Sequence, residues 1–137
     1  HICGKDHLDE SLIGTSGYVQ FEYVDAPLKH LFAIADLVIS RAGANSICEI
    51  LALRKPNILI PLSAAASRGD QILNASSFAK QGFSTMLEEE ALTDDTLYQA
   101  ISSTYENRDA FIHQMEQSHL SNAVDTVIRL IEECIAH

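Results

Sequence analysis

Short runs of apolar, largely β-branched residues alternate with longer segments of helical periodicity over the first two thirds of the chain. The runs predict strands at residues 2–3, 19–23, 37–40, 57–61 and 84–87. The segments between them predict helices at residues 9–13, 27–35, 44–53 and 70–81. Strands that alternate with helices pair in parallel, because each helix serves as the crossover between neighbouring strands. The pattern therefore predicts an α/β fold, with helices on both faces of a parallel sheet.

The last third of the chain changes character and predicts three further helices, at residues 93–107, 108–118 and 121–135. Gly82 fits the C-terminal end of the helix before them. Thr93 and the two aspartates after it fit an N-cap. Since no repeat or low-complexity linker interrupts the sequence, we expect residues 1–137 to form one domain.

Net charge, the length of apolar runs and cysteine spacing each limit what the chain can bind and where it can work. The chain has 9 Lys and Arg against 19 Asp and Glu, a formal net charge of −10 that repels phosphate backbones, so nucleic acid is not an expected partner. No apolar run reaches the roughly 18 residues that a transmembrane helix needs. Three irregularly spaced cysteines form neither a disulfide framework nor a zinc pattern, which favours a reducing cytoplasm. The chain opens on what reads as the end of a strand, so we expect a piece of a longer protein.

The loop at residues 40–45 is the first candidate ligand site. It follows a predicted strand, opens a predicted helix and consists of small residues around Gly43. Ligands of parallel sheets bind beyond the carboxyl ends of strands, where free N–H groups of helix N-termini attract anions. The loop is therefore a candidate cradle for a diphosphate. It lacks both the P-loop and the dinucleotide-fold glycine patterns, which argues against an ATPase or a simple dehydrogenase.

Two charged residues flank this loop, and each has two interpretations. Glu49 lies four residues after Asn45, on the same helix face, where its carboxylate could accept hydrogen bonds from a ribose diol. Alternatively, it is a charge on a solvated helix face. Arg41 could neutralise a leaving phosphate, or it is an ordinary surface arginine. Cys48, beside Glu49, is expected to pack inward as a small apolar residue.

The loop at residues 61–69 is the second candidate site, because it is long for a strand-to-helix connection and rich in Ala and Ser. Asp70 and Gln71 open the next predicted helix, where they could bracket the hydroxyls of a sugar, and Asn74 follows one turn later. The alternative is that Asp70 is only the N-cap. The three consecutive glutamates at residues 88–90 predict a solvated turn without a function.

Several of these motifs together resemble the donor-binding signature of the MurG family, peripheral-membrane N-acetylglucosaminyltransferases that make peptidoglycan lipid II. The resemblance spans essentially the whole chain. It rests on Ser40-Arg41-Ala42-Gly43-Ala44-Asn45, Glu49-Ile50-Leu51-Ala52-Leu53, Lys55-Pro56, Ile60-Pro61-Leu62 and Gly69-Asp70-Gln71-x-x-Asn74-Ala75. It implies the C-terminal half of a GT-B glycosyltransferase, in which two Rossmann-like domains flank a cleft and the C-terminal one, closed by extra helices, holds UDP-N-acetylglucosamine. The first strand and helix of that half would be missing.

The resemblance also implies roles for individual residues. Val24 matches the position whose backbone recognises uracil, and Glu49 matches the ribose ligand. The diphosphate region of the family corresponds to Arg41, Gly43, Ala44 and Asn45. Asp70 and Gln71 stand where the family often has a pair of glutamines that read the sugar, with Asn74 completing the motif.

The implied reaction is an inverting transfer of N-acetylglucosamine to a lipid-linked muramoyl-pentapeptide. The general base and the acceptor site belong to the family's N-terminal domain, so no catalytic residue is assigned here. No cofactor is expected, and no metal, because the chain has no Asp-x-Asp motif. The full-length protein would lie on the cytoplasmic face of the plasma membrane.

Two other functions stay open at this stage. The chain could be a non-catalytic UDP-sugar-binding subunit of a split glycosyltransferase, which acts with a separate acceptor-domain chain. A UDP-sugar epimerase is a further alternative, which the Ser40-Arg41-Ala42-Gly43 loop disfavours.

Overall fold

The computed structural model describes residues 1–25, 28–66 and 68–118. Within it the chain forms two compact units, His1–Ile34 and Ala35–His137, which we describe one at a time. The predicted helix at residues 121–135 lies outside the described residues. Among the residues described, no helix is both long and apolar enough to cross a membrane.

The N-terminal unit is held together by both backbone and side-chain hydrogen bonds. Ile2 and Phe21 form one parallel bridge, with Cys3 N donating to Phe21 O at 2.9 Å and Phe21 N donating to His1 O at 2.8 Å. The two predicted strands are therefore reduced to a bridge, since Ile2 and Phe21 are 48% and 40% exposed and bury too little apolar surface to extend the pairing. The unit also holds the 3₁₀ turn η1 (Glu10–Leu12) and helix α1 (Leu28–Ile34).

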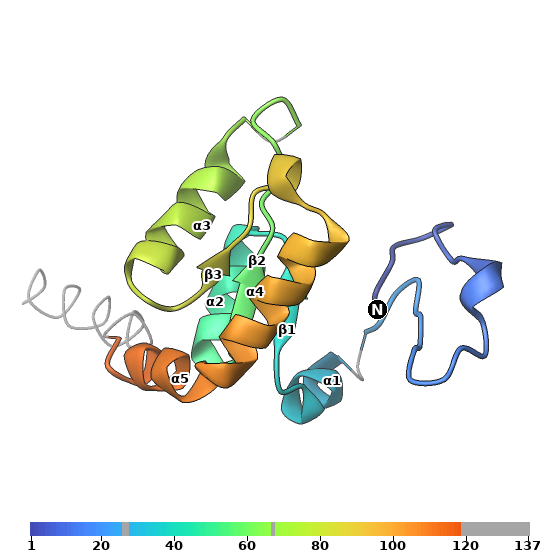
Figure 1. Ribbon diagram of the computed structural model, residues 1–137, viewed down its shortest axis with the longest axis horizontal. Coiled ribbons are helices and arrows are strands. Elements are labelled where there is room, and N and C mark those ends of the chain that lie inside the picture. Colours follow the sequence, from blue (N-terminus) through green and yellow to red (C-terminus); the bar gives the residue numbers. More distant parts are fainter. Residues whose placement is uncertain (26–27, 67, 119–137) are drawn as a thin grey trace, which may run out of the picture. The chain divides into compact units, whose positions relative to one another are not determined.

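The C-terminal unit is built on a parallel sheet of three strands in the order β1 (Val38–Ser40), β2 (Asn57–Leu59) and β3 (Thr85–Met86) (Figure 1). Val38 pairs with Asn57, and Ile58 pairs with Thr85. All three residues of β2 are buried, as expected for the central strand of a sheet covered on both faces. This confirms the predicted α/β class.

Helices α2 (Ala44–Ala52) and α3 (Asp70–Lys80) connect the three strands and contact each other. Right-handed crossovers between strands in sequential order place both helices on the same face. The buried residues of α2 recur at helical spacing, and α3 contributes Phe78, which meets Phe83 edge-on at 5.7 Å. Gly82, with a φ of +75°, ends α3 as predicted, and Phe83 N closes the turn on Phe78 O.

The remaining described elements are the 3₁₀ turn η2 (Glu89–Ala91) and helices α4 (Asp94–Glu106) and α5 (Arg108–Glu116). In Figure 1, α4 lies in front of the strands and α2 behind them. The predicted N-cap at Thr93 is present as a capping box with Thr96. Thr104, fully buried on α4, shares a 2.7 Å hydrogen bond with Thr85, which fixes α4 on the sheet.

Candidate functional site

The carboxyl ends of β1 and β2 lie side by side, and each leads into a loop that opens a helix. Eight of the nine predicted site residues lie on the first of these loops or on the first two turns of α2 and α3. Asn74 joins α3 directly to the first loop, because its Nδ2 donates a 3.0 Å hydrogen bond to the carbonyl oxygen of Ala42. Residues 32 positions apart are thereby fixed against each other, which makes this edge of the sheet one site.

The N-terminus of α2 is open to a ligand. Gly43 is its N-cap and supplies no side-chain hydrogen bond, so the first N–H groups of the helix are not capped by that residue. Ala44 and Asn45 in this first turn are exposed. An anion placed here would meet free N–H donors and the positive end of the helix dipole.

Glu49 lies one turn further along α2 and is exposed on the same side as Asn45. Within the part of the chain that the structure describes, its carboxylate forms no hydrogen bond or ion pair. The buried face of α2 consists of Ile47, Ile50 and Leu51. The prediction that Cys48 packs inward was wrong: it is exposed, because it lies beside Glu49 on the outer side of the helix.

The N-terminus of α3 excludes one of the two interpretations of Asp70. Gly69, with a φ of +84°, is the N-cap, so the alternative that Asp70 caps the helix was wrong. Asp70 is the first helical residue and its side chain is exposed. A carboxylate there is free to face a ligand while adding favourable charge to the first turn.

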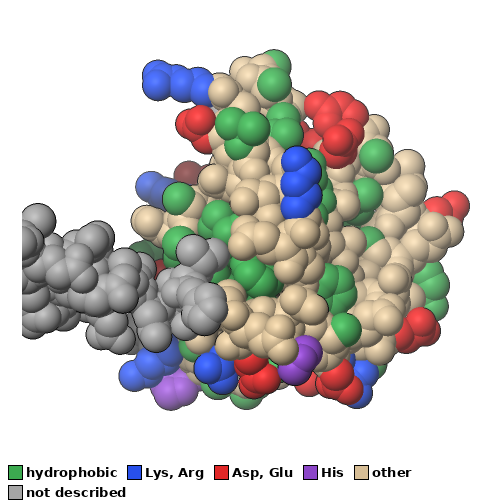
Figure 2. Space-filling model, turned by 90° about the vertical axis from the view of Figure 1, so that its left-hand side faces the viewer, with side chains coloured by type: hydrophobic (Ala, Val, Ile, Leu, Met, Phe, Trp, Pro, Cys, Tyr) green, Lys and Arg blue, Asp and Glu red, His purple; other side chains and the backbone are tan. Residues whose placement is uncertain are grey.

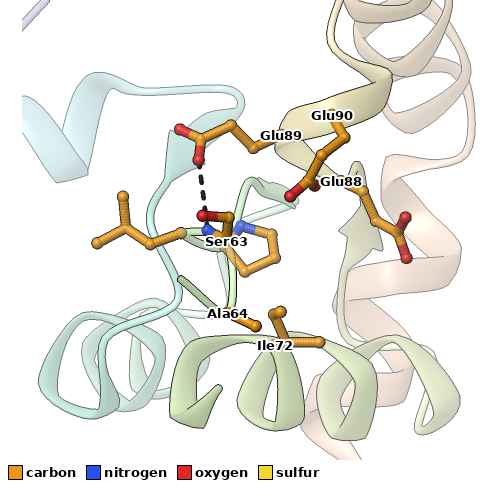
Figure 3. Close-up of a pocket in the computed structure, with 8 residues that line it drawn as sticks. Ser63, Ala64, Ile72, Glu88, Glu89 and Glu90 are labelled. Carbon is orange, nitrogen blue, oxygen red and sulfur yellow. Dashed lines mark hydrogen bonds between the residues drawn. The ribbon is translucent and has the colours of Figure 1, made fainter. Parts of the chain in front are cut away.

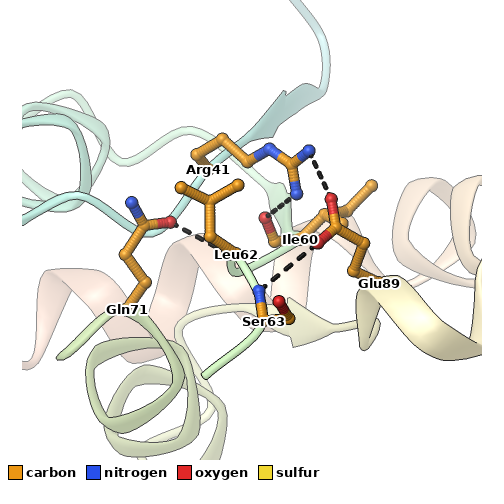
Figure 4. A network of polar contacts seen from close by, with 6 residues as sticks. All are labelled: Arg41, Ile60, Leu62, Ser63, Gln71 and Glu89. Carbon is orange, nitrogen blue, oxygen red and sulfur yellow. Dashed lines mark hydrogen bonds and ion pairs between the residues drawn. The ribbon is translucent and has the colours of Figure 1, made fainter. Parts of the chain in front are cut away.

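Gln71 turns its carboxamide back onto the second loop. Its Oε1 accepts a 3.1 Å hydrogen bond from the backbone N–H of Leu62 (Figure 4). Because the partner is a donor, the oxygen must face Leu62, which leaves the NH₂ group of Gln71 as the part that can donate to a ligand.

Arg41 lies across the carboxyl end of β2. Its Nη1 donates to the carbonyl oxygen of Ile60 at 3.2 Å, and its Nη2 forms a 2.7 Å ion pair with Glu89. The other carboxylate oxygen of Glu89 accepts from the backbone N–H of Ser63 at 3.3 Å. The hydrogen bond from Arg41, followed by the one from Ser63, lowers the pKa of Glu89. Figure 4 shows these contacts.

The interpretation of residues 88–90 as a solvated turn is thereby corrected for Glu89. Glu88 and Glu90 are exposed, but Glu89 faces the site. Local sequence patterns do not reveal this role, because Glu89 is 48 residues from Arg41 and one glutamate in a run of three carries no distinguishing signal.

A pocket of about 240 Å³ lies between the second loop and η2. Its lining residues are Pro61, Leu62, Ser63, Ala64, Ile72, Glu88, Glu89 and Glu90. In Figure 3, Glu89 reaches toward Ser63 on one side of the pocket, and Ile72 of α3 closes another side. The mixture of apolar walls with carboxylates suits a neutral, hydroxyl-rich group better than a second anion.

The ninth predicted residue, Val24, lies in the N-terminal unit, where it is half-buried.

The face drawn in Figure 2 carries acidic side chains at several separate places among apolar and neutral ones. Within residues 1–25, 28–66 and 68–118, no three His, Cys, Asp or Glu side chains are grouped so that they could hold a metal ion.

Comparison with known proteins gives a consistent assignment. The model of the glycosyltransferase family 28 C-terminal domain matches residues 1–130. A UDP-N-acetylglucosamine–N-acetylmuramyl-(pentapeptide) pyrophosphoryl-undecaprenol N-acetylglucosamine transferase of Lachnoclostridium phytofermentans is 60% identical over 133 residues, and one of Lachnospira eligens is 55% identical. Each match covers 97% of this chain and 38% of the relative, so the chain spans well under half the length of these proteins.

Two solved structures share the fold. The crystal structure of Acinetobacter baumannii MurG has a TM-score of 0.70 at 22% identity, over 84% of this chain and 35% of its own. The spinosyn forosaminyltransferase SpnP has a TM-score of 0.66 at 15% identity, over 88% of this chain and 31% of its own. Both likenesses support the α/β fold, and the family model identifies the chain as a C-terminal domain of this glycosyltransferase family.

Proposed function

Because the chain belongs to the glycosyltransferase family 28 C-terminal domain family, we propose that it is the donor-binding part of an inverting N-acetylglucosaminyltransferase. The donor is UDP-N-acetylglucosamine, and the acceptor is a lipid-linked muramoyl-pentapeptide held by another domain, on the cytoplasmic face of the plasma membrane. The names of the relatives, at 55% to 60% identity, support this donor and acceptor. Residues 1–137 would act as one UDP-sugar-binding domain.

The observation that carries the proposal is the hydrogen bond from Asn74 to Ala42, which ties α3 to the loop that opens α2 at one edge of the sheet. Two neighbouring helix N-termini form a place where a diphosphate meets uncapped N–H groups. Gly43, Ala44 and Asn45 would hold the diphosphate there. The backbone of Val24 would recognise the uracil, as the resemblance to the MurG family implies.

The other side chains would read the rest of the donor. The carboxylate of Glu49 would accept hydrogen bonds from the two ribose hydroxyls; it is exposed and forms no ion pair within the described residues. Asp70 and the NH₂ group of Gln71 contact the hydroxyls of the sugar at the start of α3.

Charge develops on the diphosphate as the bond to the anomeric carbon of the sugar breaks. The guanidinium of Arg41 and the N-terminus of α2 would stabilise this charge in place, which lowers the barrier without any movement of the protein. No described residue is assigned as the base that activates the acceptor hydroxyl.

Calorimetric titration of UDP into the chain tests the donor site. We expect Glu49→Gln to bind UDP on the order of ten- to a hundredfold more weakly, because a hydrogen bond to a charged group contributes about 1.5 to 3 kcal/mol. Glu106→Gln, at the far end of α4, removes the same charge and should bind as the unaltered chain does. Equal affinities for the Glu49 variant and the unaltered chain, or no binding at millimolar UDP, would overturn the proposal.

A further inference from the structure

Three side chains from three separate elements hold the backbone where β2 ends. Arg41, from the loop after β1, donates to Ile60 O. Gln71, from α3, accepts from Leu62 N, and Glu89, from η2, accepts from Ser63 N. Arg41 and Glu89 are themselves paired at 2.7 Å, so the first loop, the second loop and η2 form one connected network.

The chemistry of the network requires a carboxylate at position 89. Both of its partners are donors, namely the guanidinium of Arg41 and the N–H of Ser63, and each uses a different oxygen of Glu89. A glutamine has one acceptor oxygen and one donor NH₂ group. It could satisfy Arg41 or Ser63, but its NH₂ group would then point at the other donor.

The same contacts leave some N–H donors of the Arg41 guanidinium available to a ligand. A guanidinium has five N–H donors. Two of its hydrogen bonds, to Ile60 and Glu89, are made within the described part of the chain. Arg41 is still half-exposed, with 49% of its side chain accessible, so the remaining donors can reach a ligand. A guanidinium already fixed at two points loses less conformational entropy when it binds a phosphate.

We propose that Glu89 is a positioning residue for the nucleotide diphosphate, acting through Arg41 and the loop at Ser63. Glu89 does not touch the diphosphate; it fixes the guanidinium of Arg41 at the carboxyl end of β2 and holds the loop that leads to Gln71. This inference rests on the proposed function, because it assumes that the diphosphate binds beside Arg41.

Calorimetric titrations of UDP and of uridine, into the unaltered chain, Glu89→Gln and the charge-matched Glu106→Gln, test the inference. We expect Glu89→Gln to bind UDP about fivefold more weakly, while uridine, which has no phosphate, binds within about twofold of the unaltered chain. In an Arg41→Met background, Glu89→Gln should change UDP affinity by less than about twofold. The melting temperature of each variant shows that it is folded.

The possible outcomes separate this inference from the proposed function. No UDP binding by the unaltered chain would overturn both. UDP binding that is unchanged in Glu89→Gln, or tighter because a repelling carboxylate is gone, would overturn the positioning role alone. An equal loss of uridine and UDP affinity would also overturn it, because that pattern indicates general damage to the loop.

Discussion

Asn74 is the single residue on which the geometry of the site most depends. Its hydrogen bond to Ala42 satisfies a carbonyl group of a fully buried residue, on the loop where the diphosphate is proposed to bind. A buried acceptor that loses its donor keeps the full cost of its desolvation.

We therefore expect Asn74→Ala to lower the free energy of unfolding by about 1 to 3 kcal/mol. Asn74→Asp should cost at least as much, because a carboxylate oxygen would then face the Ala42 carbonyl. Urea unfolding followed by circular dichroism gives the values. Asn45→Ala, at an exposed position of α2, is the matched control and should change stability by less than about 0.5 kcal/mol.

Glu89 makes the stability of the chain depend on pH in acid. The hydrogen bond from Arg41 holds the pKa of Glu89 below its ordinary value of 4.5. A carboxyl group with a lowered pKa stabilises the fold above its unfolded pKa, and that contribution is lost as the pH falls through the folded pKa. The melting temperature of the unaltered chain should therefore exceed that of Glu89→Gln near neutral pH and converge with it below 4.5. A gap that stays constant into strong acid would contradict this.

At the scale of elements, the two helices of the site begin in different ways. Gly69 opens α3 with a φ of +84°, a left-handed conformation that side chains with a Cβ rarely adopt. Gly43 opens α2 with a φ of −66°, and an added Cβ there would meet nothing within 4 Å. Gly69 is therefore required by the backbone conformation, whereas Gly43 leaves space beside the N-terminus of α2.

Replacing each of these glycines with alanine should therefore separate an effect on stability from an effect on UDP affinity. Gly69→Ala is expected to lower the free energy of unfolding by about 1 to 2 kcal/mol. Gly43→Ala should leave stability within about 0.5 kcal/mol of the unaltered chain, but weaken UDP binding by filling the space where the diphosphate approaches. Urea unfolding and calorimetry on both variants measure the two effects. A Gly43→Ala chain with unaltered UDP affinity would place the diphosphate elsewhere.

At the scale of the whole molecule, a ligand that binds only the folded chain stabilises it by mass action. We expect UDP at a hundred times its dissociation constant to add about 2.7 kcal/mol, seen as a rise in melting temperature that grows with concentration. Uridine at equal concentration should give a smaller rise, since it lacks the group that Arg41 and the start of α2 would hold. Equal shifts with both ligands would show that the diphosphate does not contribute to binding.

The chain order of strands and helices in the C-terminal unit follows from the sequence by itself. Helical periodicity and capping residues act over a few positions, so the bounds of α2, α3 and α4 could be predicted to within one or two residues. The same local signals placed Arg41, Gly43 and Glu49 around the start of one helix. The N-terminal strands were overestimated, because local β-propensity does not reveal how little surface Ile2 and Phe21 bury.

Only the tertiary structure decided which distant groups meet at the site. The pairing of Arg41 with Glu89 joins residues 48 positions apart, and the bond from Asn74 to Ala42 joins residues 32 apart. Each depends on the parallel register of β1, β2 and β3, which brings the carboxyl ends of the strands to one edge. Local patterns determine where the chain turns, but hydrogen bonds between residues distant in the sequence require the sheet that brings them together.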